Sequence, residues 1–198
     1  MNLSKWIVMM VVLFVACAGA GGESVAGPVV TVFCQSDLAV PYATETQAER
    51  LASDMFEDIG ITLRWRSGQP SSKDTGAIAI EFLTGTSERF MPESLAYALP
   101  YEGVHIRIFW DRIRKFTAPR ELLAHVIVHE VTHILEGTAC HSEAGIMKAH
   151  WTTDDLFAME STPIKFTPGD VDLIYQGLES RETALLGVVQ AKVHRPPL

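Results

Sequence analysis

The chain has 198 residues, of which 47% are hydrophobic, so its length and composition suit one domain with a buried core, alone or with a tail. Its 24 acidic residues outnumber its 16 basic ones, which gives a formal net charge of −8. The sequence has no basic patch interleaved with aromatic residues, and this argues against a nucleic acid as partner.

The first 20 residues have the pattern of a secretory signal peptide. Lys5 gives a positive start, residues 6–16 form an apolar stretch too short for a membrane span, and residues 18–20 form a small-residue cleavage site. We therefore expect export, either secretion or residence in a periplasm. Cys17 leaves an alternative open, because the four residues that end in it resemble a bacterial lipoprotein box. In that case a lipid on Cys17 would anchor the protein.

Residues 21–27 are interpreted as a flexible leader, and predicted strands and one predicted helix follow. Apolar runs that are β-branched or alternating predict three strands, and apolar residues at helical spacing predict one helix. The strands are expected at 29–33, 61–65 and 77–82, and the helix at 46–59. Strand, helix, strand, strand is typical of an α/β fold with a mostly parallel sheet on which helices pack.

Residues 84–102 are less regular, and residues 94–99 within them fit either a short strand or a surface segment. Residues 103–110 alternate between two sides, one of them apolar, which predicts a strand. His105 falls on the other side, so we interpret it as a solvent-facing histidine and not as a metal ligand.

A predicted helix carries the residues with the clearest chemistry. It opens at Pro119, with Thr117 as its cap, and ends before Gly137, which can adopt the left-handed conformation that terminates helices. His129 and His133 are four residues apart, so on a helix both imidazoles leave the same face. Two neutral imidazoles on one face can bind one Zn²⁺.

Other polar residues complete the predicted site. Glu130 projects to the flank, where its carboxylate can reach a water on the metal, as the general base of a zinc hydrolase does. A catalytic zinc needs a third protein ligand and one open position, and His141 can supply the ligand. A tight apolar turn that ends in Met147 follows. His125 lies one turn before His129, but a fourth histidine would close the open position, so we interpret it as packed or hydrogen-bonded.

This run of residues resembles the signature of the metzincin clan of zinc endopeptidases, most of all its matrixin branch. The clan's signature is HExxHxxGxxH followed by a turn that contains Met. The present motif reads HExxHxxxGxxxH, with one more residue on each side of the glycine, as in small bacterial matrixin-like proteins. The resemblance is strong over residues 118–150 and traceable over residues 28–178.

The resemblance implies an α+β zincin fold, in which a small twisted sheet packs on an N-terminal helix and the active-site helix, with a C-terminal helix behind them. It implies an edge strand that lines the cleft and pairs with extended substrate, supplied by residues 94–99 or 104–110. It also implies three zinc ligands, a base, a turn glycine and a methionine under the metal, namely His129, His133 and His141, Glu130, Gly137 and Met147.

The C-terminal part is predicted to hold a short turn and a last helix. Trp151 is expected to pack near the metal site. Thr167 is expected to cap the last helix, with Pro168 and Asp170 in its first turn. The carboxylate of Asp170 either caps the helix alone or also supports the backbone of the turn at Met147.

These elements place the catalytic domain at residues 28–180 and a frayed tail at residues 181–198. Two cysteines remain outside the signal peptide, and in an exported chain they predict a disulfide between Cys34 and Cys140. Two free thiols are one alternative, and Cys140 as a zinc ligand beside His141 is another.

Taken together, the sequence predicts a monomeric, exported, zinc-dependent endopeptidase that hydrolyses peptide or protein substrates, with Glu130 as general base and Zn²⁺ as cofactor. Two other functions stay open. One is a zinc-binding module without turnover, and the other is a zinc amidase that acts on cell-wall peptides.

Overall fold

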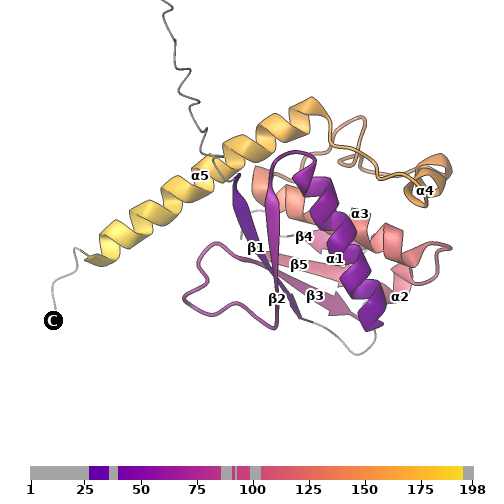
Figure 1. Ribbon diagram of the computed structural model, residues 1–198, viewed down its shortest axis with the longest axis horizontal. Coiled ribbons are helices and arrows are strands. Elements are labelled where there is room, and N and C mark those ends of the chain that lie inside the picture. Colours follow the sequence, from indigo (N-terminus) through magenta and orange to yellow (C-terminus); the bar gives the residue numbers. More distant parts are fainter. Residues whose placement is uncertain (1–26, 36–39, 86–90, 92, 99–103, 194–198) are drawn as a thin grey trace, which may run out of the picture.

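The computed structural model of the protein describes residues 27–193 apart from 36–39, 86–90, 92 and 99–103, and gives only the backbone for residues 188–193. This part of the chain alternates between strands and helices (Figure 1). In chain order they are β1 Val29–Gln35, α1 Tyr42–Glu57, β2 Thr62–Ser67, β3 Ile78–Leu83, β4 Ala96–Ala98, β5 His105–Phe109, α2 Trp110–Ile113, α3 Pro119–Glu136, α4 Thr153–Met159 and α5 Pro168–Val193. The expected α/β class is confirmed.

The five strands form one mostly parallel sheet in the order β2-β1-β3-β5-β4. The first three neighbouring pairs in this order are parallel, and β4 runs antiparallel to β5 at the edge. Of the two segments that we expected to supply an edge strand, residues 94–99 therefore contain it, whereas residues 104–110 lie inside the sheet. His105 on β5 is exposed, as expected.

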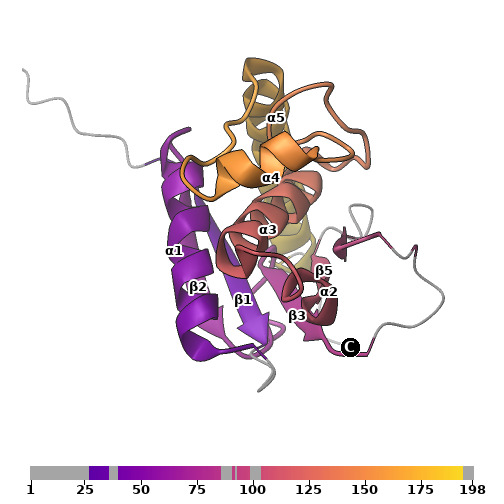
Figure 2. The same cartoon turned by 90° about the vertical axis from the view of Figure 1, so that its right-hand side faces the viewer.

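Helices α1 and α3 lie side by side and cover one face of the sheet (Figures 1 and 2). Helix α1 packs on β2, and α3 packs on β4 and β5. The burial of β5 alternates, with Ile106 and Ile108 buried and Arg107 exposed, because successive strand residues point to opposite faces. On the exposed face Arg107 pairs with Glu81 at 3.1 Å.

The core lies between the sheet and these two helices. Its largest fully buried side chains come mainly from α1, the strands and α3, and include Phe56, Ile78, Ile80, Ile106, Ile108, Leu123, Ile127, Ile134 and Leu135. Helix α3 is buried along most of its length and is the central helix of the domain. Side chains that such a core fixes on α3 keep their geometry.

The predicted frayed tail at residues 181–198 is wrong for residues 181–193, which belong to helix α5. The helix continues to Val193, because residues 181–193 contain good helix formers and no proline. Arg181 of this helix donates a hydrogen bond of 2.8 Å to the carbonyl of Gly76, which ties α5 to the body of the domain. The helix crosses α3 at Gly177, where a Cβ atom would lie 1.8 Å from the carbonyl oxygen of Leu135.

Other boundaries also differ from the predicted ones. Helix α1 starts at Tyr42, earlier than expected, because Thr44 and Glu45 already donate to the carbonyl of Pro41. The predicted turn at residues 154–159 is helix α4, which has a capping box of Thr152 and Asp155.

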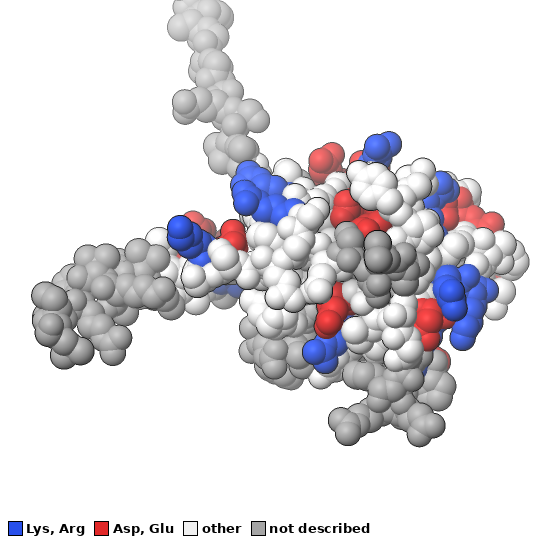
Figure 3. All heavy atoms as spheres, turned by 90° about the horizontal axis from the view of Figure 1, so that it is seen from below, with Lys and Arg blue, Asp and Glu red and all other residues white. Residues whose placement is uncertain are grey.

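Acidic and basic side chains are interspersed on the face that Figure 3 shows. Among the described residues, no helix is both long enough and apolar enough to cross a membrane. The predicted signal peptide and its Cys17 lie outside the described residues.

Candidate metal centre

Helix α3 carries two of the histidines, and a proline at its start and a glycine at its end fix where it begins and stops. Pro119 occupies its first turn, but Ala118 and not the predicted Thr117 is the N-cap, and it makes no side-chain cap. At the other end Gly137 has a φ of 67° and donates to the carbonyl of His133 at 3.0 Å. This left-handed residue turns the chain back toward the helix, as predicted.

The turn brings three imidazoles to one point. The Nε2 atoms of His129 and His133 are 3.1 Å apart, and those of His133 and His141 are 3.3 Å apart. The ring of His133 stands nearly perpendicular to those of the other two, at 86° to His129 and 89° to His141. The three residues form a group whose ligand atoms all lie within 4.8 Å of one another. The structure therefore brings His141 to the two helical histidines despite the longer motif.

The protonation of two rings shows why this group fits a cation. The Nδ1 atom of His129 faces the carbonyl of Ile146 at 2.9 Å, and that of His133 faces the carbonyl of Thr138 at 3.0 Å. A carbonyl only accepts, so in each ring Nδ1 carries the proton and Nε2 presents a lone pair. Burial lowers the pKa of both His129 and His133 to about 4, so both rings are neutral near pH 7.

Two lone pairs that face each other at 3.1 Å repel unless a cation lies between them. Burial also lowers the pKa of His141, which favours its neutral form. Three neutral imidazoles that converge through Nε2 match the donor set of a three-histidine zinc site with one open position. The residues present thus fit Zn²⁺.

Glu130 lies beside this group and is 9% exposed. Its carboxylate accepts a hydrogen bond from the backbone N–H of Ala98 on β4, which favours the charged form. Burial nevertheless dominates and raises the pKa of Glu130 to about 8. A cation at the histidines would oppose that rise, because an opposite charge nearby favours the carboxylate.

The turn that contains Met147 is a compact loop against the start of α5. Gly145 has a φ of 74°, and a Cβ atom there would lie 2.8 Å from the carbonyl oxygen of Lys165. Ile146 donates to that same carbonyl at 3.0 Å, and its own carbonyl faces His129. Ile146 and Met147 are buried, at 0% and 1% exposed. The turn therefore orients His129 through its backbone and contributes Met147 to the core.

Asp170 links this loop to the last helix. It is 1% exposed, and Thr167 and Asp170 form the predicted capping pair, with Thr167 N–H on the carboxylate at 2.8 Å. The other carboxylate oxygen accepts a hydrogen bond from the hydroxyl of Ser142, the neighbour of His141. Ser142 in turn donates its N–H to the carbonyl of Met147 at 2.8 Å. Asp170 thus both caps α5 and holds the loop that carries His141 and Met147.

His125 is hydrogen-bonded, as expected. Its Nδ1 faces the carbonyl of Glu121 at 2.7 Å, and its Nε2 accepts from the N–H of Ile164 at 3.1 Å. Both ring nitrogens are used, so His125 has no lone pair left for a metal. Trp151 packs edge-on against His129, with ring centroids 5.6 Å apart, which confirms its expected place near the site.

The predicted disulfide is not formed, because Cys34 and Cys140 are both free cysteines. Leu135, at the end of α3, lines the same cavity as the first residues of β1, and Cys34 lies near the opposite end of that strand. Cys140 follows α3 and is exposed, so the two thiols lie at different ends of the sheet. Burial raises the pKa of the Cys34 thiol, which hydrogen-bonds Glu49.

The sequence did not indicate two residues that contact the site, Ala98 and Ser142. Ala98 reaches Glu130 through its backbone, so its side-chain type carries no signal. Ser142 is a small polar loop residue, and only its position directly after His141 could have drawn attention to it.

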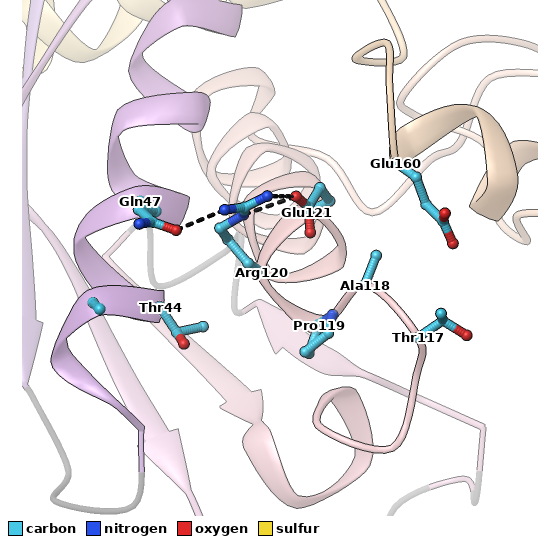
Figure 4. A pocket seen from close by; sticks show the side chains of 9 residues that line it. Thr44, Gln47, Thr117, Ala118, Pro119, Arg120, Glu121 and Glu160 are labelled. Carbon is cyan, nitrogen blue, oxygen red and sulfur yellow. Dashed lines mark hydrogen bonds and ion pairs between the residues drawn. The ribbon is translucent and has the colours of Figure 1, made fainter.

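One cavity of about 440 Å³ lies at the opposite end of α3 from the histidines. Figure 4 shows its polar lining, in which Arg120 donates to Gln47 and Glu121. Arg120, Gln47 and Glu121 already bond one another, and the lining contains no histidine, so the cavity offers no donor set comparable to the three imidazoles.

No protein-family model and no curated protein matches the sequence. In fold, the chain is similar to archaemetzincin from Methanopyrus kandleri, whose crystal structure matches with a TM-score of 0.51 and 10% sequence identity. The match covers 80% of this chain and 99% of that one. At this identity the similarity concerns the fold, which is zincin-like, with a mostly parallel sheet and helices packed on it.

Proposed function

We propose that the protein is a zinc-dependent endopeptidase. The observation that carries this proposal is the convergence of three neutral imidazoles through Nε2, with a buried carboxylate on Glu130, the residue after the first of them. The fold similarity to archaemetzincin supports it, because the name of that protein places it among the metzincins that the sequence motif resembles.

In this proposal His129, His133 and His141 hold the metal. When bound, Zn²⁺ supplies Lewis acidity that makes a water nucleophilic near neutral pH. The backbone carbonyls that bind His129 and His133 fix the tautomer of each ring, so that the lone pair stays on Nε2. Gly137 allows the turn that returns the chain to His141, and Met147 packs in the core below the loop.

Glu130 acts as the general base. Its carboxylate accepts a proton from the attacking water and returns it to the nitrogen of the departing amine, so the proton passes from water to product. The hydrogen bond from Ala98 fixes the carboxylate and leaves its remaining lone pairs for this transfer.

Strand β4 binds the substrate. In the described part of the chain it pairs with β5 alone, so its other side offers backbone groups to an extended peptide. Such a peptide gains main-chain hydrogen bonds with few demands on its side chains. Because Ala98 of β4 bonds Glu130, a peptide added to this strand passes close to the base.

We also propose that the protein is exported by the signal peptide at residues 1–20, with lipid anchoring through Cys17 as the alternative. Mass spectrometry of the native N-terminus distinguishes the two, since cleavage near Gly21 and a lipidated Cys17 differ in mass.

Metal analysis together with a peptide-library digest, with and without a chelator, tests the enzymatic proposal. We expect one zinc per chain and cleavage within peptides that stops when the chelator is added. Zinc binding without cleavage of any peptide would instead indicate a zinc-binding module, and cleavage restricted to cell-wall peptides would indicate an amidase.

A further inference from the structure

An apolar cavity of about 140 Å³ lies between helix α4 and the turn that precedes α3. Its apolar lining comes from Phe116, Leu122, Leu156, Phe157 and Met159. Phe157 is 66% exposed and Phe116 is 39% exposed, so two aromatic rings stand in solvent beside it. Clustered exposed apolar groups mark binding sites, and an apolar cavity of roughly 150 Å³ accepts a benzene-sized group. The cavity therefore fits one bulky apolar side chain.

The neighbouring polar cavity differs in this respect. It shares Thr117, Ala118 and Glu160 with the apolar one (Figure 4). Its central group, Arg120, is already bonded to two side chains. Of the two cavities, the apolar one is thus the better binding site for a side chain from outside the protein.

The apolar cavity is aligned with the histidines along α3. Leu122 and His129 are seven residues apart, which places them on the same face of the helix and about 10 Å apart along its axis. Trp151 packs on His129, and α4 begins two residues later at Thr153, which lines the cavity. The chain that leaves the metal site therefore leads directly to the cavity.

The direction of β4 shows which part of a substrate would reach it. The start of β4 lies near α2, because Phe109 donates to the carbonyl of Leu95 and Arg112 donates to that of Ser94. Its end, Ala98, bonds Glu130. Strand β4 thus runs from the side of the cavity toward the base. A peptide that pairs antiparallel with β4 runs the opposite way, from the base toward the cavity.

In this antiparallel pairing, the residues that follow the scissile bond lie on the side of the cavity. An extended peptide advances about 3.3 Å per residue, so about three residues span the 10 Å that separate Leu122, in the cavity lining, from His129 along α3. Resting on the proposed endopeptidase function, we infer that this cavity selects substrates with a bulky apolar side chain, such as Leu, Met or Phe, at about the third position after the scissile bond.

Two peptides that differ only at that position, Leu in one and Ser in the other, test the inference. We expect the wild-type enzyme to cleave the Leu peptide with a kcat/KM about tenfold higher, which is typical for an apolar pocket. Phe157→Ser should bring this ratio close to one and leave cleavage of peptides that end before the third position unchanged. Leu173→Ser is the matched control, because Leu173 is 46% exposed on α5 and lines none of the described cavities.

An unchanged ratio in Phe157→Ser, or a preference located before the scissile bond, would overturn the inference. Binding of the same two peptides to a Glu130→Gln variant, measured by fluorescence anisotropy, separates this outcome from failure of the enzymatic proposal. If no peptide is cleaved but the Leu peptide binds about tenfold more tightly, and Phe157→Ser abolishes the difference, the cavity is confirmed and the endopeptidase proposal fails. Equal binding of both peptides rejects the cavity.

Discussion

The backbone N–H of Ala98 donates a hydrogen bond to the carboxylate of Glu130. The edge strand β4 and the proposed base are therefore joined directly. The strand that positions the carboxylate of Glu130 also places a peptide that pairs with it next to that carboxylate.

Replacing Glu130 should separate metal binding from turnover. Glu130→Gln keeps the shape of the side chain but removes the base, so we expect a fall in kcat/KM of at least about 100-fold. Zinc content should stay at the wild-type value, because Glu130 is not part of the histidine group. Peptidase assays and metal analysis of the same preparations check this. A variant with wild-type rates would show that another group accepts the proton.

Replacing His141 should weaken zinc binding sharply. His141→Ala leaves two imidazoles, and a zinc site with two protein ligands loses much of its binding free energy. His105→Ala is the control, since His105 is exposed on β5. Competition with a chromogenic chelator measures both affinities. Equal zinc content after dialysis of the two variants would remove His141 from the ligand set.

The metal-free protein should lose stability as the pH rises. The folded pKa of Glu130, about 8, lies above its ordinary value of 4.5. The folded state therefore binds a proton that the unfolded chain has released, and this contribution disappears as the pH rises through 8. Between pH 6.5 and 8.5 we expect a loss of about 2 kcal/mol in the free energy of unfolding.

Urea unfolding in the presence of a chelator measures this loss, and Glu130→Gln provides the comparison. Glu136, whose pKa burial raises to about 7, adds a change of the same sign in both proteins. The low pKa values of His129 and His133 add a change of the opposite sign near pH 6.5, where the unfolded histidines still lose protons, and this change is the same in both proteins. Identical pH profiles for wild type and variant would show that Glu130 is not buried in the folded state.

Replacing Asp170 should lower both the free energy of unfolding and the affinity for zinc. Asp170→Ala loses the helix cap and also the acceptor of the Ser142 hydroxyl, whereas Thr167→Ala loses part of the cap alone. We expect each variant to lose about 1 kcal/mol in unfolding free energy. Only Asp170→Ala should also weaken zinc binding, because it frees the loop that carries His141. Equal zinc affinity in the two variants would limit Asp170 to capping.

The two cysteines should react as separate thiols. Cys140 is exposed and should be alkylated in the native protein, whereas Cys34 is buried and should react only after unfolding. Mass spectrometry of alkylated peptides, without prior reduction, identifies each site. A cross-linked peptide that contains both residues would restore the disulfide that the sequence suggested.

The sequence was informative where side-chain chemistry and local signals coincide. Helix α3, its stop at Gly137 and the shared face of His129 and His133 all follow from spacing within one element. The position of His141 could be proposed from the motif, but its distance from the other rings depends on the path of the loop, which Asp170 holds from the distant helix α5 through Ser142. The contact of Ala98 depends on strand pairing, to which the side chain contributes nothing.

Two of the errors concern parts of the chain far from the motif. The cysteine count and the expected export predict a disulfide, but β1 carries Cys34 away from the end of α3, and the sequence does not reveal this separation. Residues 181–198 are predicted to fray as a chain terminus, whereas the helix-forming run at their start continues α5 to Val193.

The crossing at Gly177 has a consequence for genetics. Even an alanine there would place a methyl group inside the normal contact distance of Leu135, two residues past His133, and push α5 off helix α3. Position 177 lies outside every motif, yet random mutagenesis that selects for lost activity should recover it alongside the histidines themselves.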